Sequence, residues 1–154
     1  MTGSRAATTR GDQVHTFFGM RNSVLATSEE TDGAFGAVEI TVPPRGGPPL
    51  HTNTREALGY YGLEGKLSFV TESGHRELHP GEVLSLRKGG THTFVNKTDA
   101  PARALMIATP GGFEGFFAAA ARELPADAPG GPPPPEMVAK LAEISGRYGM
   151  TLHP

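Results

Sequence analysis

The residues "PLHTNTREALGYYGLEGKLSF", positions 49–69, combine two polar side chains with two runs typical of β-strands. Residues two apart on a strand project to the same face, so His51 and Asn53 share one face of a strand, and Leu58 and Tyr60 share one face of the next. We expect both pairs to face inward. The stretch thus predicts a polar site inside a β-structure.

Similar β-branched or aromatic runs recur along the chain between turn residues such as DG, PPRGGPP, HPG and KGG. The predicted strands cover 14–18, 23–27, 35–42, 57–63, 66–71, 82–86, 92–95 and 103–109. Short strands at this spacing indicate an all-β sandwich or barrel. In the run 35–42, Val38, Ile40 and Val42 alternate with Glu39 and Thr41, which predicts one apolar and one mixed face.

The last third of the chain changes to helical periodicity. Phe113, Phe116 and Phe117 begin one apolar stripe, and Val138, Leu141 and Ile144 form a second one after the segment "PADAPGGPPPP". We therefore predict a disordered tail over 1–12, a β-barrel over 13–110, and an extension over 111–154 with two α-helices that pack on the barrel or on a partner subunit.

Composition excludes several classes of protein. The 14 Lys and Arg residues balance 16 Asp and Glu, which favours neither nucleic acid nor a membrane surface as partner. Cys is absent, so disulfides, thiolate metal sites and a Cys nucleophile are excluded. Neither a secretory signal nor an apolar run of membrane-spanning length is present, and we expect a cytoplasmic protein.

Two motifs resemble those of the cupin superfamily. The first motif has the family's spacing: it contains His51, then Asn53, and, after four further residues, Leu58, followed by Gly65. In the second, which has Arg87 where the family has proline, the matching positions are Gly81, Gly89, His92 and Asn96. The resemblance covers residues 22–110 and implies a cupin jelly-roll barrel. The C-terminal segment is similar to that of small bacterial quercetin-dioxygenase-like cupins, which implies a homodimer.

Metal-binding cupins carry three His and one Glu at the motif positions that here read His51, Asn53, Leu58 and His92. An amide oxygen is a poor ligand for a transition metal, and leucine offers no donor at all. Catalytic metal sites keep three good protein ligands, so we predict no metal cofactor. The alternative is a single divalent transition metal held by His51, His92 and Glu56, whose parity matches that of Leu58.

These residues suit proton transfer in a hydrophobic, polyketide-like substrate. We predict His51 and His92 as acid–base or positioning groups, and Asn53 as the group that binds a substrate carbonyl. Tyr60 is predicted as part of the pocket wall, where it donates a hydrogen bond or stacks on the substrate. The predicted substrate contacts are Leu58, Phe94, Glu39 and Phe35. The leading hypothesis is a metal-independent cyclase or isomerase. The alternatives are a metal-dependent dioxygenase of the quercetinase type and a non-catalytic binding protein.

Overall fold

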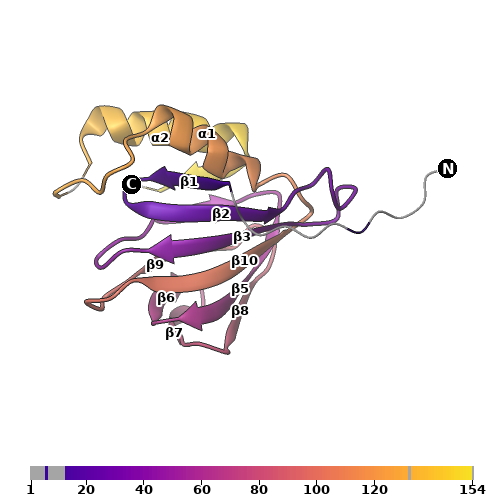
Figure 1. Ribbon diagram of the computed structural model, residues 1–154, viewed down its shortest axis with the longest axis horizontal. Helices are drawn as coiled ribbons and strands as arrows, with labels where there is room; N and C mark the ends of the chain where they lie inside the picture. The colour runs from indigo at the N-terminus through magenta and orange to yellow at the C-terminus, as the bar shows by residue number, and fades with distance from the viewer. Residues whose placement is uncertain (1–5, 7–12, 132, 154) are drawn as a thin grey trace.

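Two antiparallel sheets face each other around one core (Figure 1). The computed structural model describes residues 6, 13–131 and 133–153, so most of the predicted disordered tail lies outside the described residues. In spatial order the first sheet contains β1 (Val14–Phe17), β2 (Met20–Ala26), β3 (Gly36–Val42), β10 (Ala102–Thr109), β5 (Ala57–Glu64) and β8 (Val83–Leu86). The second contains β11 (Met150–Leu152), β4 (His51–Asn53), β9 (Thr91–Val95), β6 (Leu67–Thr71) and β7 (Gly74–Leu78). The predicted all-β barrel is confirmed.

The inner faces of the sheets follow the period-two pattern of the sequence. On β3, Val38, Ile40 and Val42 are buried, and on the neighbouring β10 the same alternation buries Ala104 and Met106. Each buried aliphatic side chain is removed from water, which contributes about 1.5–3 kcal/mol for the larger ones. This core holds the strands that carry the motif residues in a fixed register.

Two helices lie over the β1 and β2 side of the barrel, as Figure 1 shows at the top of the view. They are α1 (Gly115–Glu123) and α2 (Pro135–Arg147), which agrees with the two predicted helices. Phe116 of α1 meets Phe17 of β1 edge to face, with ring centroids 5.7 Å apart. Arg147 of α2 binds Glu123 of α1 at 2.7 Å. The apolar stripe that begins at Phe113 therefore packs on the barrel.

The C-terminal extension also contains a strand that the periodicity did not predict. After α2, the chain forms β11, which pairs with β4 and places Leu152 opposite His51. The strand is only three residues long and carries one threonine between two apolar residues. Such a pattern is too short to distinguish a strand from a helix end.

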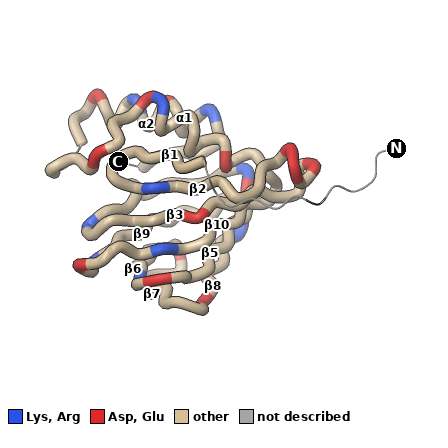
Figure 2. The backbone as a smooth tube through the Cα atoms, viewed as in Figure 1, with Lys and Arg blue, Asp and Glu red and all other residues tan. Residues whose placement is uncertain are grey.

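Lys and Arg positions are interspersed with Asp and Glu positions along the backbone (Figure 2). None of the helices in the described ranges is long and apolar enough to span a bilayer. These observations agree with the charge balance of the sequence.

A buried carboxylate joins α1 to the strand β3. Glu114, at the start of α1, accepts hydrogen bonds from the amides of Ser28 at 2.6 Å and Gly112 at 2.7 Å. Its carboxylate lies against Gly36, where a Cβ atom would overlap Glu114 Oε1. Position 36 therefore excludes side chains unless these hydrogen bonds break.

We expect Gly36→Ala to lower the free energy of unfolding by about 2 kcal/mol, because the new methyl group displaces a buried, hydrogen-bonded carboxylate. Gly59→Ala on β5 is the matched control, since nothing lies within 4 Å of a Cβ added there. Urea denaturation measures both variants. Equal stability of the two variants would contradict the proposed overlap.

Candidate functional site

The four motif positions are all buried. His51 and Asn53 come from β4, Leu58 from β5 and His92 from β9, and their exposed fractions are 5%, 1%, 4% and 0%. Register pairing places His51 directly opposite His92, and the two imidazole centroids lie 4.3 Å apart. Asn53 shares the inward face of His51. The structure brings His51 and His92 together, whereas Leu58 pairs with Leu86 and Ala108 in the first sheet.

An apolar cavity of about 740 Å³ opens beside this cluster. His51, Tyr60 and Phe94 lie on its wall, whereas His92 and Asn53 are outside its lining. The rest of the inner wall is aromatic or aliphatic and comprises Phe17, Ile40, Met106, Phe113, Phe116 and Leu141. Drug-sized ligands occupy cavities of this size and polarity.

His51 is held in one tautomer. Its Nδ1 donates a hydrogen bond to the carbonyl oxygen of Pro49 at 2.9 Å. The proton therefore sits on Nδ1, and Nε2 keeps its lone pair. Burial lowers the pKa of His51, because a charged imidazole would lose its hydration, and His153 lowers it further. The ring is accordingly neutral and basic at Nε2.

Tyr60 connects the cavity wall to His92. Its hydroxyl lies 3.1 Å from His92 Nε2, and burial raises the pKa of Tyr60, so the phenol keeps its proton and donates it. Burial first, and the charge of His51 second, lower the pKa of His92 to about 3. His92 is thus a neutral acceptor that positions Tyr60 from behind the wall.

Several buried polar atoms of the site lack a partner in the described structure. Both amide atoms of Asn53, Nδ1 of His92 and Oε1 of Glu56 are buried and make no hydrogen bond there. An unpaired buried polar group costs about 1–3 kcal/mol. The side chain of Asn53 therefore has unused hydrogen-bonding capacity just outside the cavity lining.

The residues present do not fit a transition metal of the family type. Burial raises the pKa of Glu56, and the charged side chains that affect this pKa are Arg55 and Glu114 rather than the two imidazoles. No group of three or more His, Cys, Asp or Glu side chains in the described part of the chain is arranged to hold a metal ion. The donors at the motif are two imidazoles, one of which is engaged by Tyr60, and an amide. The alternative set of His51, His92 and Glu56 is therefore not assembled.

The structure separates the predicted substrate contacts. Phe94 lies on the cavity wall, whereas Leu58 borders a second, open cavity of about 1340 Å³ between β5, β6, β7 and β8. The prediction for Leu58 as a contact in the apolar cavity is therefore corrected, and so are two others. Glu39 points to the outer face and binds Arg103 at 3.2 Å, because its neighbours in β3 are the buried ones. Phe35 precedes β3, is 38% exposed and lies outside both linings.

Sequence reasoning missed several wall residues from distant segments. Met150, Leu152 and His153 reach the cavity because β11 pairs with β4. Phe113 and Phe116, interpreted from the sequence as core or dimer packing, also line it. Periodicity shows that such residues are buried, but not that their face borders a cavity.

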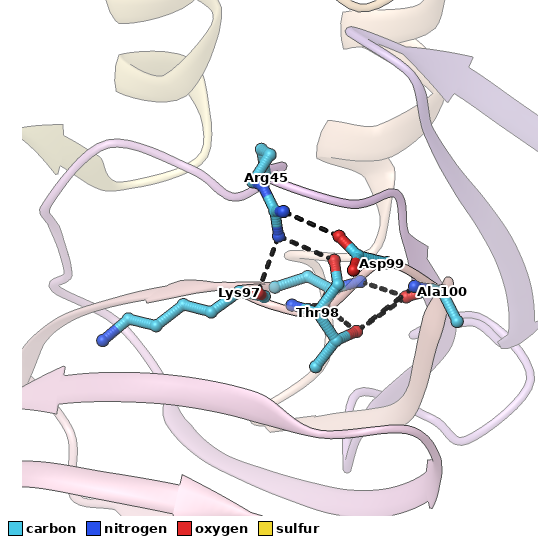
Figure 3. Close-up of polar contacts among 6 residues, drawn as sticks. Arg45, Lys97, Thr98, Asp99 and Ala100 are labelled. Atoms are coloured by element: carbon cyan, nitrogen blue, oxygen red, sulfur yellow. Dashed lines mark hydrogen bonds and ion pairs between the residues drawn. The ribbon is translucent and has the colours of Figure 1, made fainter.

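The rim of the cavity contains one cationic side chain, Arg45, whose charge is already engaged. Figure 3 shows its guanidinium between Lys97, Thr98 and Asp99. It donates to the carbonyl oxygens of Lys97 and Thr98 at 2.6 and 2.9 Å, and to Asp99 Oδ1 at 2.7 Å. The described lining therefore presents no unengaged Lys or Arg to a ligand.

Comparison with known proteins agrees with this architecture. Residues 38–108 match the family model of the cupin domain. A sugar phosphate isomerase of the cupin superfamily from Silicibacter pomeroyi is 26% identical, with a TM-score of 0.51 over 59% of this chain and 59% of its own. The chain thus spans less than two thirds of that isomerase. A search of curated protein sequences finds no match.

Two further solved structures share the fold. The polyketide cyclase RemF from Streptomyces resistomycificus is 23% identical, with a TM-score of 0.58 over 68% of this chain and 79% of RemF. A predicted oxalate decarboxylase from Thermotoga maritima is 18% identical, with a TM-score of 0.60 over 68% of this chain and 99% of its own. At these identities the likeness shows the fold alone.

The lowered pKa values predict a loss of stability in acid. The unfolded chain binds more protons than the folded one below the ordinary histidine pKa of 6.5 and down to about 3, so stability falls as the pH drops through this window. His92→Gln should reduce the slope by about 1.4 kcal/mol per pH unit. Urea denaturation across the window measures it. An unchanged slope would contradict the burial argument, and the exposed His75→Gln is the control.

Restoring the missing donors should create a metal site. We expect the double variant Asn53→His with Leu58→Glu to bind about one divalent ion per chain, because it completes three imidazoles and a carboxylate. Elemental analysis and a rise of the melting temperature on addition of Ni²⁺ measure binding. The single variant Leu58→Gln, which adds neither an imidazole nor a carboxylate, is the control. Failure to bind would mean that the strand spacing, rather than the donor set, differs from metal-binding relatives.

Proposed function

Because residues 38–108 of this chain form a cupin domain, we propose that the protein is a tailoring enzyme of the cyclase or isomerase type. Its substrate is a hydrophobic, flat, polyketide-like molecule bound in the apolar cavity, and catalysis proceeds without a metal ion. The observation that carries this proposal is His51, whose Nδ1 donates to Pro49 and whose Nε2 is therefore unprotonated, in the lining of a mostly apolar and aromatic cavity.

The wall favours an uncharged ligand. A phosphate or carboxylate group requires a free cation or several amide donors, whereas Arg45 is engaged by Asp99 and two carbonyl oxygens. An anion in the cavity would remain without a counter-charge, which is costly in an apolar site. This argument supports a polyketide-like substrate over a sugar phosphate.

His51 is the proposed general base. Its Nε2 takes a proton from a carbon that lies next to a substrate carbonyl, and the electron pair of the broken C–H bond moves into the enolate. In an isomerisation the resulting imidazolium returns the proton to another carbon. In a cyclisation the enolate carbon forms a bond to a second carbonyl carbon of the substrate, the π electrons of that carbonyl move onto its oxygen, and the imidazolium protonates the alkoxide, so that His51 ends neutral in both cases. The Pro49 carbonyl stabilises the charged intermediate through its bond to Nδ1.

Asn53 and Tyr60 complete the proposed mechanism. The side-chain amide of Asn53 has no partner in the described structure but lies behind the cavity lining, so in this proposal it turns toward the developing enolate oxygen when a substrate binds. Tyr60, fixed by His92 at 3.1 Å, packs against the substrate ring and sets its angle to His51. His92 is therefore a positioning residue, since it acts through Tyr60.

The proposal of a metal-free reaction rests on the chemistry of the donors. Leu58 stands where the resemblance implies a carboxylate ligand, and one of the two imidazoles is engaged by Tyr60. Elemental analysis of untagged protein, purified without chelator, tests this point. About one transition-metal ion per chain, with oxygen uptake on flavonol substrates, would support a dioxygenase instead.

The variant His51→Asn tests the base. Asparagine keeps a donor toward Pro49 and removes the basic nitrogen, so kcat should fall about 10²- to 10⁴-fold on polyketide-type diketones, with chelator present throughout. The exposed His79→Asn is the control and should keep wild-type activity. Unchanged turnover in His51→Asn would contradict the role of His51. Tight binding without turnover by the wild type would support a non-catalytic binding protein.

A further inference from the structure

The turn between β1 and β2 has an unexpected residue at its first position. Phe17 pairs with Met20, which leaves a two-residue loop of Phe18 and Gly19 with φ angles of 50° and 77°. Two positive φ angles define a type I′ hairpin turn, in which Asn, Asp or Gly is strongly preferred at the first position. A phenylalanine there is strained, because its Cβ approaches the backbone.

The backbone of this turn does not require phenylalanine. The amides of Phe18 and Gly19 donate to the carbonyl oxygens of Pro125 at 2.8 Å and Ala126 at 2.7 Å, in the linker that follows α1. These bonds use main-chain atoms alone, so asparagine at position 18 would form them as well. A Cβ on Gly19 would lie 3.0 Å from the Cβ of Ala128, which shows how closely the linker covers the turn.

The phenylalanine ring lies at the mouth of the apolar cavity. Phe18 borders the cavity together with Ala128 and Pro129, two exposed residues of the linker. Its ring is half-buried and meets Phe17 edge to face at 6.2 Å between centroids. Phe17 itself is buried deeper in the same wall. Phe18 therefore presents an aromatic surface where a ligand passes from solvent into the cavity.

We propose that Phe18 is a specificity-determining residue whose ring stacks on the face of a flat, uncharged, conjugated ligand at the cavity mouth. This inference rests on the proposed function and specifies the class of substrate for the same site. Offset or edge-to-face contact between aromatic rings contributes beyond the area it buries, which distinguishes flat ligands from aliphatic ones of equal size. Strain retained at a binding surface is typical of residues selected for recognition rather than stability.

The test compares thermal stability with affinity in the same variants. Phe18→Asn relieves the strain, so its melting temperature should be at least that of the wild type and up to about 2 °C higher. Its Kd for the tricyclic polyketide emodin should rise about fivefold, because the stacking ring is lost. Absorbance titration with emodin measures Kd. Phe18→Tyr should keep wild-type affinity. Phe35→Asn, at an exposed phenylalanine outside the cavity, is the control for affinity.

Unchanged affinity in Phe18→Asn would overturn the inference. If that variant loses thermal stability, Phe18→Leu decides, because it keeps an apolar side chain but no aromatic face. Weaker binding by Phe18→Leu then supports stacking, and wild-type binding overturns it. Absence of emodin binding by the wild type would instead count against the proposed aromatic substrate, and it would overturn this inference with it.

Discussion

The site depends on the pairing of β4 with its two neighbours, β9 and β11. β4 is three residues long, and this pairing places His51 between His92 on one side and Leu152 on the other. On the outer face, Thr52 Oγ1 contacts Thr91 Oγ1 at 2.6 Å and His153 Nε2 at 2.7 Å. So short a strand has few hydrogen bonds of its own, and its neighbours determine its register. The orientation of His51 therefore depends on the C-terminal residues of the structure, a hundred positions along the chain.

Burial then determines the charge of the site. Burial lowers the pKa of both imidazoles, so both are more stable when neutral, and the charge of His51 further lowers the pKa of His92. A divalent ion at this place would require an anionic ligand to offset its charge, yet Leu58 occupies that position. Asn53 and Leu58 both weaken the binding of a divalent ion at this place, since neither supplies a charge or a strong donor. Together they give a site suited to uncharged ligands and to proton transfer by neutral groups.

The fold was accessible from the sequence because its signals are local. The alternation of Val38, Ile40 and Val42, and the spacing from His51 to His92, identified the barrel and the converging motif residues. Features that rest on contacts across the chain were not accessible. β7 carries exposed polar residues on an edge and has little apolar alternation, and β11 is too short to give a period. Glu39 was placed on the mixed face, but only the structure revealed its partner, Arg103. Phe18 borders the cavity and Phe35 does not, and no local sequence pattern encodes this difference.

The strength of the proposed base restricts the substrate. A lowered pKa makes His51 neutral and ready to accept a proton, but it also makes the imidazole a weaker base. A weak base removes protons effectively only from carbon acids that are themselves acidic, or whose enolate is stabilised as it forms. Carbons flanked by two carbonyl groups satisfy the first condition, and the unpaired amide of Asn53 can supply the second. In the proposed function, a weak base at His51 thus agrees with poly-carbonyl substrates, in which conjugation both acidifies the C–H bond and flattens the molecule.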